Sequence, residues 1–273
     1  MKKKNIITAE SETVEENNDK VNIRKSVNIL KLLPSAVTIA AFCFGLTAVR
    51  FALFQKWELA VICIFISALL DAFDGKVARL LGQSSQFGAE LDSLSDLVCF
   101  GVAPSIILFL STMYRFNGIG WAACMFFTVC CAMRLARFNA TQIANVPQPD
   151  WAKKYFTGVP APAGAILALF PLILFFATDK TCFLNVWFVV FCLLASGALM
   201  ISTLKTFSSK MVEINSNSAL LSLLVISFLV ICLITELWLT LSILVFAYLI
   251  SIPFGPCEYA KLQKREAASE EEK

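Results

Sequence analysis

The chain has 273 residues, of which 58% are hydrophobic, and its mean hydropathy is +0.73. This composition is typical of an integral membrane protein and excludes an ordinary soluble domain. The net charge of +3 is too small to indicate nucleic-acid binding, and the lack of any histidine excludes a histidine general base and a histidine-ligated zinc site.

The ten cysteines do not indicate a disulfide framework or a metal site. No C-x-x-C spacing occurs, and most of the cysteines lie inside apolar runs, where the thiol behaves as a small hydrophobic side chain. Any proton transfer that the protein performs must therefore use a carboxylate, Tyr, Lys, Cys or water.

The N-terminal segment is predicted to lie outside the membrane. Residues 1–20 contain three early lysines and then a polar, acidic stretch, so they lack the apolar core of a signal peptide. We expect them to form a disordered cytoplasmic tail. Residues 21–33 mix basic and apolar residues at roughly helical spacing, which fits an interfacial helix and equally a positively flanked start of the first span.

Eight apolar segments follow, with lengths that suit membrane spans. They cover approximately residues 32–54, 59–81, 88–113, 119–138, 160–177, 183–204, 219–234 and 237–252. The last two are almost continuous, and one helix over both would be about 50 Å long, which exceeds a hydrocarbon core of about 30 Å. We therefore predict a tight turn at Thr235 and Glu236 between two short spans.

The distribution of lysine and arginine predicts that both termini are cytoplasmic. If the N-terminus is inside, the predicted outer segments hold only Arg50, Lys56, Arg115 and Lys180 of the 23 basic residues. An even number of spans then returns the C-terminus to the cytoplasm. This orientation also places the cytoplasmic ends of the second and third spans where soluble substrates can reach them.

The expected fold is an all-α integral membrane bundle of about eight transmembrane helices. Its predicted parts are a disordered tail (residues 1–20), a membrane core that includes the interfacial helix (21–210), a C-terminal transmembrane hairpin (211–256) and a charged cytoplasmic tail (257–273).

Four aspartates stand at the predicted cytoplasmic ends of the second and third spans: Asp71, Asp74, Asp92 and Asp96. The first two are three residues apart and the last two are four apart, so each pair shares one face of a helix. Carboxylates at membrane depth are costly and functional by default. Because four converging carboxylates repel one another, we expect them to bind hard divalent cations, Mg²⁺ or Mn²⁺, through oxygen ligands.

Small residues and one arginine accompany these carboxylates. Gly75 follows Asp74 directly and would let a ligand approach closely, and Ala78 keeps the same helix surface small. Arg79 supplies a permanent planar cation that suits phosphate oxygens. The pattern indicates a site that holds a phosphorylated ligand between metal ions and a cation, as an in-line displacement at phosphorus requires.

The pattern D-x2-D-G-x2-A-R-x8-G-x3-D-x3-D, from Asp71 to Asp96, resembles the signature of the CDP-alcohol phosphotransferases, integral membrane enzymes of phospholipid synthesis. Every signature position is matched, and the eight specified residues at fixed spacing make a chance match improbable. The resemblance implies a six-helix family core, extended here by two C-terminal spans, and a homodimer.

The resemblance also implies a role for each matched residue. Asp71, Asp74 and Asp92 would bind two divalent cations, Mg²⁺ or Mn²⁺. Asp96 would lie close to a metal and act as the general base that takes the proton of the acceptor hydroxyl. The cytidine diphosphate site would be formed by Asp71, Gly75, Ala78 and Arg79. The reaction would be a single displacement at the phosphorus of the lipid phosphate, with CMP as the leaving group.

Three further stretches, residues 90–105, 134–139 and 156–164, resemble the bacterial branch of this family that uses L-serine. The resemblance implies transfer of the phosphatidyl group from CDP-diacylglycerol to the serine hydroxyl, giving phosphatidylserine and CMP. The implied location is the bacterial inner membrane, with the active site facing the cytoplasm. CDP-diacylglycerol, L-serine, membrane lipids and a second copy of the chain are the expected partners, and no nucleic acid is expected.

Three basic residues are candidates for binding the acceptor or a phosphate. Arg134 and Arg137 are three residues apart at a cytoplasmic helix end, where they could hold a carboxylate or phosphate. The same positions also suit ordinary anchoring of a helix at the inner face. Lys205 fits a ligand contact and a topology anchor equally well.

One position departs from the pattern of the resembled family. Many members begin the first span with Pro-Asn and place a threonine three residues after the asparagine. Here Pro34 is followed by Ser35, while Thr38 occupies the threonine position. The shorter hydroxyl of Ser35 weakens any assignment of that residue to the nucleotide site.

Two other functions stay open from the sequence. The same chemistry could use choline, glycerol 3-phosphate or an inositol compound as acceptor, because the charges of Arg134, Arg137 and Lys205 would also suit a phosphorylated alcohol. A divalent-cation transporter would instead line an ion path with the carboxylates. The carboxylates cluster at one membrane face, however, and no comparable polar residues continue to the other.

Overall fold

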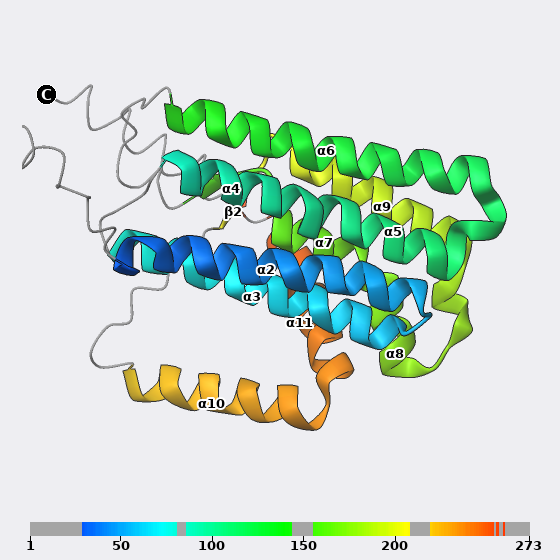
Figure 1. Ribbon diagram of the computed structural model, residues 1–273. Coiled ribbons are helices and arrows are strands. Elements are labelled where there is room, and N and C mark those ends of the chain that lie inside the picture. Colours follow the sequence, from blue (N-terminus) through cyan, green and yellow to red (C-terminus); the bar gives the residue numbers. More distant parts are fainter. Residues whose placement is uncertain are drawn as a thin grey trace, which may run out of the picture.

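A computed structural model of the chain describes residues 29–80, 86–143, 155–207 and 219–253, together with residues 255, 256 and 259. These residues are helical apart from turns and one pair of short strands, and most of the helices run side by side (Figure 1). The predicted all-α class is thus confirmed in its main feature. The predicted tail at residues 1–20, and all of the charged tail except residue 259, lie outside the described residues.

The first two helices form a hairpin. Helix α2 spans Ile29–Leu53, and helix α3 spans Trp57–Leu80. A short turn joins them, in which Gln55 adopts a positive φ of 58°. The helices approach closely because small residues face the contact: the Ser67 hydroxyl donates a hydrogen bond to the backbone oxygen of Ala41 at 3.0 Å. This close packing fixes the position of the second half of α3 relative to α2.

The third rod of the bundle is a chain of short helical pieces rather than one regular α-helix. It comprises α4 (Gln86–Asp96), the π-helical η1 (Leu97–Val102), α5 (Ala103–Leu108), the π-helical η2 (Phe109–Met113) and the 3₁₀-helical η3 (Tyr114–Phe116). Helix α6 (Asn117–Ile143) then returns along the rod. Gly101 in η1 lets the rod lie against Cys131 of α6. π-Helical turns occur frequently beside functional sites, and η1 begins directly after Asp96.

The next part of the chain pairs two three-residue strands that the sequence did not predict. Strand β1 (Tyr155–Thr157) is antiparallel to β2 (Lys205–Phe207), with Thr157 opposite Lys205. Between them, α7 (Ala161–Ala168) and α8 (Phe170–Thr178) meet at a 49° bend. The 3₁₀-helical η5 (Thr181–Leu184) and α9 (Val186–Ile201) bring the chain back to β2.

The C-terminal hairpin consists of α10 (Ala219–Thr235) and α11 (Leu237–Ser251). The helix is interrupted at Glu236, so the predicted break at Thr235 and Glu236 is confirmed, while the assignment of two membrane spans stays a prediction. Helix α11 packs against α8, whereas α10 stands apart from the bundle (Figure 1). Most of the described side chains of α10 are exposed, as suits a helix that faces lipid.

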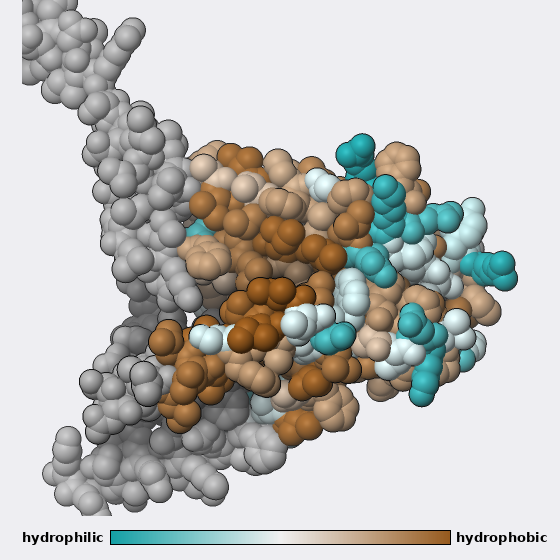
Figure 2. Space-filling view, turned by 90° about the horizontal axis from the view of Figure 1, so that it is seen from below, coloured by the Kyte–Doolittle hydropathy of each residue, from teal (hydrophilic) through white to brown (hydrophobic). Residues whose placement is uncertain are grey.

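The surface is divided between an apolar body and a hydrophilic end. Figure 2 shows apolar side chains over much of the described surface and hydrophilic ones gathered at the end where α2 turns into α3. Within the described ranges, three helices are long and apolar enough to cross a membrane: Ser35–Leu53, Phe87–Phe116 and Gly118–Thr141. A fourth span results if α7 and α8 count as one bent span. Each of the eight predicted segments contains a helix, while the number of spans stays a prediction.

The junction between β1 and α7 depends on Gly158. This residue has φ = +80°, and a Cβ built on it would lie 2.6 Å from the backbone oxygen of Met200 and 2.9 Å from that of Ser202. Its N–H donates to the backbone oxygen of Leu204 at 2.8 Å. No side chain can adopt this position without moving backbone atoms.

We therefore predict that Gly158→Ala destabilises the protein. Left-handed backbone at a residue with a Cβ costs about 1–3 kcal/mol, and the contact with two carbonyl oxygens adds to that cost. The melting temperature in detergent should fall by several degrees. Gly118→Ala is the matched control, because a Cβ at Gly118 in α6 meets nothing within 4 Å. Equal melting temperatures for the two variants would show that the junction does not need glycine.

Candidate active site

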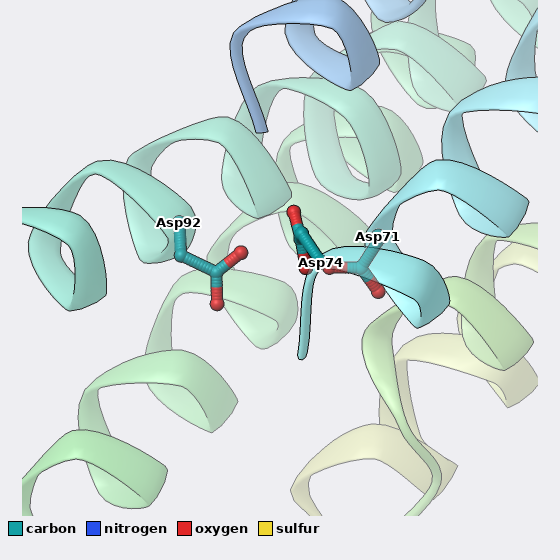
Figure 3. Close-up of side chains that lie close together, drawn as sticks. All are labelled: Asp71, Asp74 and Asp92. Carbon is teal, nitrogen blue, oxygen red and sulfur yellow. The ribbon is translucent and has the colours of Figure 1, made fainter. Parts of the chain in front are cut away.

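Helices α3 and α4 bring three of the four motif carboxylates together. Asp71 and Asp74 come from α3 and Asp92 comes from α4, and their side chains point into a common space (Figure 3). One carboxylate oxygen from each lies within 4.8 Å of the other two. Asp74 is only 5% exposed. Three negative charges so close in a partly buried site repel strongly unless a cation lies between them.

The carboxylate of Asp74 is oriented from outside the motif. The hydroxyl of Thr38 on α2 donates a hydrogen bond to Asp74 Oδ2 at 2.9 Å, and both side chains are buried. The N–H of Gly75 also bonds to this carboxylate. In the sequence, Thr38 stands out only as the threonine near the start of the first predicted span. Its contact could not be read from spacing, because 36 residues separate the two partners.

The donor set fits a hard divalent cation. Asp92 Oδ1 is buried and has no hydrogen-bond partner in the structure, although it lies beside two further carboxylates. A buried carboxylate oxygen without a hydrogen bond is costly, and a metal ion would satisfy it. The set contains only carboxylate oxygens, which suits Mg²⁺ or Mn²⁺ better than the softer metals. The three residues can therefore hold a divalent metal ion.

Asp96 lies next to this cluster but is not one of its three members. A side-chain hydrogen bond joins Asp96 to Asp71. The positive charge of Arg134, on α6, acts on both of them. Asp96, the residue directly before η1, thus interacts both with the carboxylate of Asp71 and with the positive charge of Arg134.

The last turns of α6 carry three polar residues that reach three different parts of the structure. Arg134 interacts electrostatically with Asp96 and Asp71. Asn139 binds the hydroxyl of Ser93, next to Asp92, with Nδ2 to Oγ at 2.9 Å, and so ties α4 to α6.

Arg137 holds the end of α9. Its Nη1 donates to the backbone oxygen of Ile201 at 2.8 Å, and its Nη2 donates to that of Thr157 at 3.1 Å. Longer contacts reach the backbone oxygens of Met200 and Ser202. The guanidinium therefore satisfies carbonyl groups at a helix C-terminus, which is a structural task.

Lys205 lies on β2, close to Arg137. Its Nζ donates to the hydroxyl of Thr157 at 2.9 Å and lies 5.0 Å from the centre of the Tyr259 ring. Partial burial, followed by the positive charge of Arg137, lowers the pKa of Lys205 from its usual value. Of the three basic candidates from the sequence, only Arg134 is shown to interact with the motif carboxylates.

The residues expected around the cytidine diphosphate group lie on the last part of α3. Gly75 is exposed, and a Cβ built on it would meet nothing within 4 Å. Packing against the described residues therefore does not explain a glycine at this position. The backbone of Ala78 and Arg79 is helical, and their side chains lie outside the described part of the structure.

The Thr38–Asp74 hydrogen bond generates a prediction about metal affinity. Thr38→Val keeps the shape of the side chain and removes the donor, so Asp74 loses a bond that fixes its carboxylate. We expect Mn²⁺ affinity to fall about 10- to 100-fold, the usual effect of removing a group that orients a metal ligand. The affinity is measured from the rise in melting temperature as Mn²⁺ is titrated into the protein in detergent. Thr38→Ser retains the donor and should bind Mn²⁺ nearly as well as wild type; wild-type affinity in the valine variant would refute the orienting role.

Comparison with known proteins identifies the family. The model of the CDP-alcohol phosphatidyltransferase family matches residues 31–196. A Mycobacterium bovis protein named CDP-diacylglycerol–serine O-phosphatidyltransferase is 36% identical over 232 residues, which cover 85% of this chain and 80% of that protein. Proteins of the same name from Helicobacter pylori J99 and Bacillus subtilis are 34% and 37% identical, over 74% and 51% of this chain and 82% and 75% of their own lengths.

The matched region contains α3, α4 and α6, and therefore every carboxylate of the candidate site together with Arg134. The relatives extend the match beyond it to most of the chain. The sequence motif, the convergence of its carboxylates and these similarities agree: the chain belongs to the CDP-alcohol phosphatidyltransferase family.

Proposed function

We propose that the protein transfers the phosphatidyl group of CDP-diacylglycerol to the hydroxyl of L-serine, releasing CMP. The observation that carries this assignment is the shared name of relatives from Mycobacterium, Helicobacter and Bacillus, the first two of which match 85% and 74% of this chain. The cluster of Asp71, Asp74 and Asp92 gives that assignment a physical basis, because phosphoryl transfer needs charge neutralisation around the reacting phosphate.

The reaction is a single displacement at the phosphorus that carries diacylglycerol. A bond forms between the serine hydroxyl oxygen and this phosphorus, and the bond to the oxygen bridging to CMP breaks. CMP leaves with that oxygen, and the serine hydroxyl proton passes to a base. Asp96 is the proposed base, because it adjoins the metal-binding carboxylates without belonging to their group of three.

Separate groups of residues would bind the metal ions and the cytidine diphosphate group. Asp71, Asp74 and Asp92 would hold two divalent cations, Mg²⁺ or Mn²⁺, which when bound would neutralise charge on the attacking and leaving oxygens. Thr38 would orient Asp74 for this task. The cytidine diphosphate group would lie against Asp71, Gly75, Ala78 and Arg79.

The acceptor side is proposed to lie at the end of α6. Arg134 faces the carboxylates and would bind the anionic part of the acceptor, whereas Arg137 and Lys205 would act mainly by holding β1, β2 and the end of α9 in place. We further propose a homodimer in the bacterial inner membrane, with the active site open to the cytoplasm. The positive-inside distribution of lysine and arginine supports that orientation.

The decisive experiment measures CMP release by purified protein in detergent with CDP-diacylglycerol and Mn²⁺ or Mg²⁺, with and without L-serine. We expect release that depends on serine and that stops when EDTA removes the metal. Asp92→Asn should lower kcat roughly 100-fold or more, because it weakens the charge stabilisation of the transition state. Release with choline, glycerol 3-phosphate or an inositol compound but not with serine would keep the chemistry and replace the acceptor.

The role of Gly75 can be tested separately from folding. Gly75→Ala adds a methyl group that meets no described atom within 4 Å and favours the helix, so the melting temperature should not fall. If the nucleotide lies against this surface, the methyl group should raise KM for CDP-diacylglycerol about tenfold while KM for serine changes little. An unchanged KM for CDP-diacylglycerol would remove Gly75 from the nucleotide site.

A further inference from the structure

Helix α11 lies outside the residues that the family model matches, yet it is built into the bundle through its packing against α8. Its residue Tyr248 packs against a hydrophobic cluster that includes Val159 and Leu167. Val159 directly follows Gly158, at the junction between β1 and α7. The ring of Tyr248 therefore reaches the part of the bundle that Arg137 and Lys205 hold together.

The hydroxyl of Tyr248 is buried and has no hydrogen-bond partner in the part of the chain that the structure describes. Among the described residues, two buried side-chain polar atoms share this property, and the other is Asp92 Oδ1 in the carboxylate cluster. Buried tyrosine hydroxyls usually find a partner, because burying one without a hydrogen bond is unfavourable. A phenylalanine would fill the same apolar surroundings without that cost, so packing alone does not account for the hydroxyl.

The charge of Arg134 acts on the Tyr248 hydroxyl. Arg134 in turn interacts with Asp96 and Asp71. Arg134 on α6 thus interacts electrostatically with a phenol on α11 and with the proposed base at the end of α4, two elements far apart in the sequence. A phenol O–H and a guanidinium are both donors, and donors that converge suit a carboxylate.

We propose that Tyr248 is a specificity-determining residue that, with Arg134, binds the carboxylate of the amino-acid acceptor. This inference rests on the proposed function, which supplies an acceptor with a carboxylate and a hydroxyl. With the carboxylate held by α11 and α6, the hydroxyl of serine can be directed toward Asp96 on α4. The C-terminal hairpin would then contribute to acceptor selection rather than only to anchoring.

The test compares wild type with Tyr248→Phe, which keeps the ring in its cluster and removes only the hydroxyl. We expect KM for L-serine to rise roughly tenfold, as the loss of one hydrogen bond to a charged group predicts, with KM for CDP-diacylglycerol and Mn²⁺ affinity unchanged. The acceptor analogue serinol lacks the carboxylate. The preference of the enzyme for serine over serinol, as a ratio of kcat/KM values, should therefore fall by a similar factor.

Tyr114→Phe is the matched control, because Tyr114 is exposed on η3 and its ring contacts Phe109. It should leave both KM values as they are. If Tyr248→Phe is recovered in poor yield, Tyr248→Met is assayed in its place. Methionine also removes the hydroxyl, and its flexible apolar side chain can fill the space of the ring. A variant that keeps wild-type KM for serine, or loses activity with serine and serinol equally, overturns the proposal.

The same assays separate this inference from the proposed function. Serine-dependent CMP release by wild type, together with an unchanged serine KM in Tyr248→Phe, leaves the function in place and rejects the role of Tyr248. Wild type that uses a different alcohol and ignores serine rejects the function, and the inference falls with it.

Discussion

The structure depends on the convergence of like charges inside an apolar bundle. Asp71, Asp74 and Asp92 place carboxylate oxygens within 4.8 Å of one another on helices that otherwise consist largely of apolar residues. Without compensation, burial and mutual repulsion both oppose this arrangement. A divalent cation bound there would convert the repulsion into ligation, so the features that make the cluster unfavourable on its own suit it to a hard metal ion.

Such a site needs helices that are held at fixed depth and rotation, and small residues make this possible. Gly45 of α2 lies so close to Cys99 of η1 that an added Cβ would overlap the thiol, and Ser67 bonds to the backbone of Ala41. Close backbone contact of this kind stabilises helix pairs in lipid, where apolar burial does little to distinguish partners. It also brings Thr38 within hydrogen-bond distance of Asp74, so the packing of α2 against α3 directly positions a metal ligand.

The parts that the sequence could predict are those that depend on local periodicity. The spacing of Asp71 and Asp74 places both on one face of a helix, and the length of the apolar stretch around Thr235 requires a break there. The family could be identified for the same reason, because its signature is a local pattern of residue types. These predictions need no knowledge of which helix lies beside which.

The parts that escaped prediction are contacts between distant segments. Pairing of β1 with β2 brings Thr157 opposite Lys205, and the guanidinium of Arg137 reaches carbonyl oxygens more than 60 residues away in Ile201 and Ser202. A pair of arginines three residues apart on one helix looks like a single binding surface in the sequence. In the structure Arg134 turns to the carboxylates and Arg137 turns to the end of α9, because different neighbours pack against each.

The two helices of the C-terminal hairpin have unequal roles for a physical reason. In lipid, an apolar helix such as α10 loses nothing by standing apart, since its exposed side chains meet hydrocarbon rather than water. Contact with the bundle therefore needs specific packing, and α11 provides it through Val245 and Ile252, which are buried against Val159 and Phe170. Of the two helices, α11 is the one that carries a buried polar atom without a partner among the described residues, the hydroxyl of Tyr248, on which the charge of Arg134 acts.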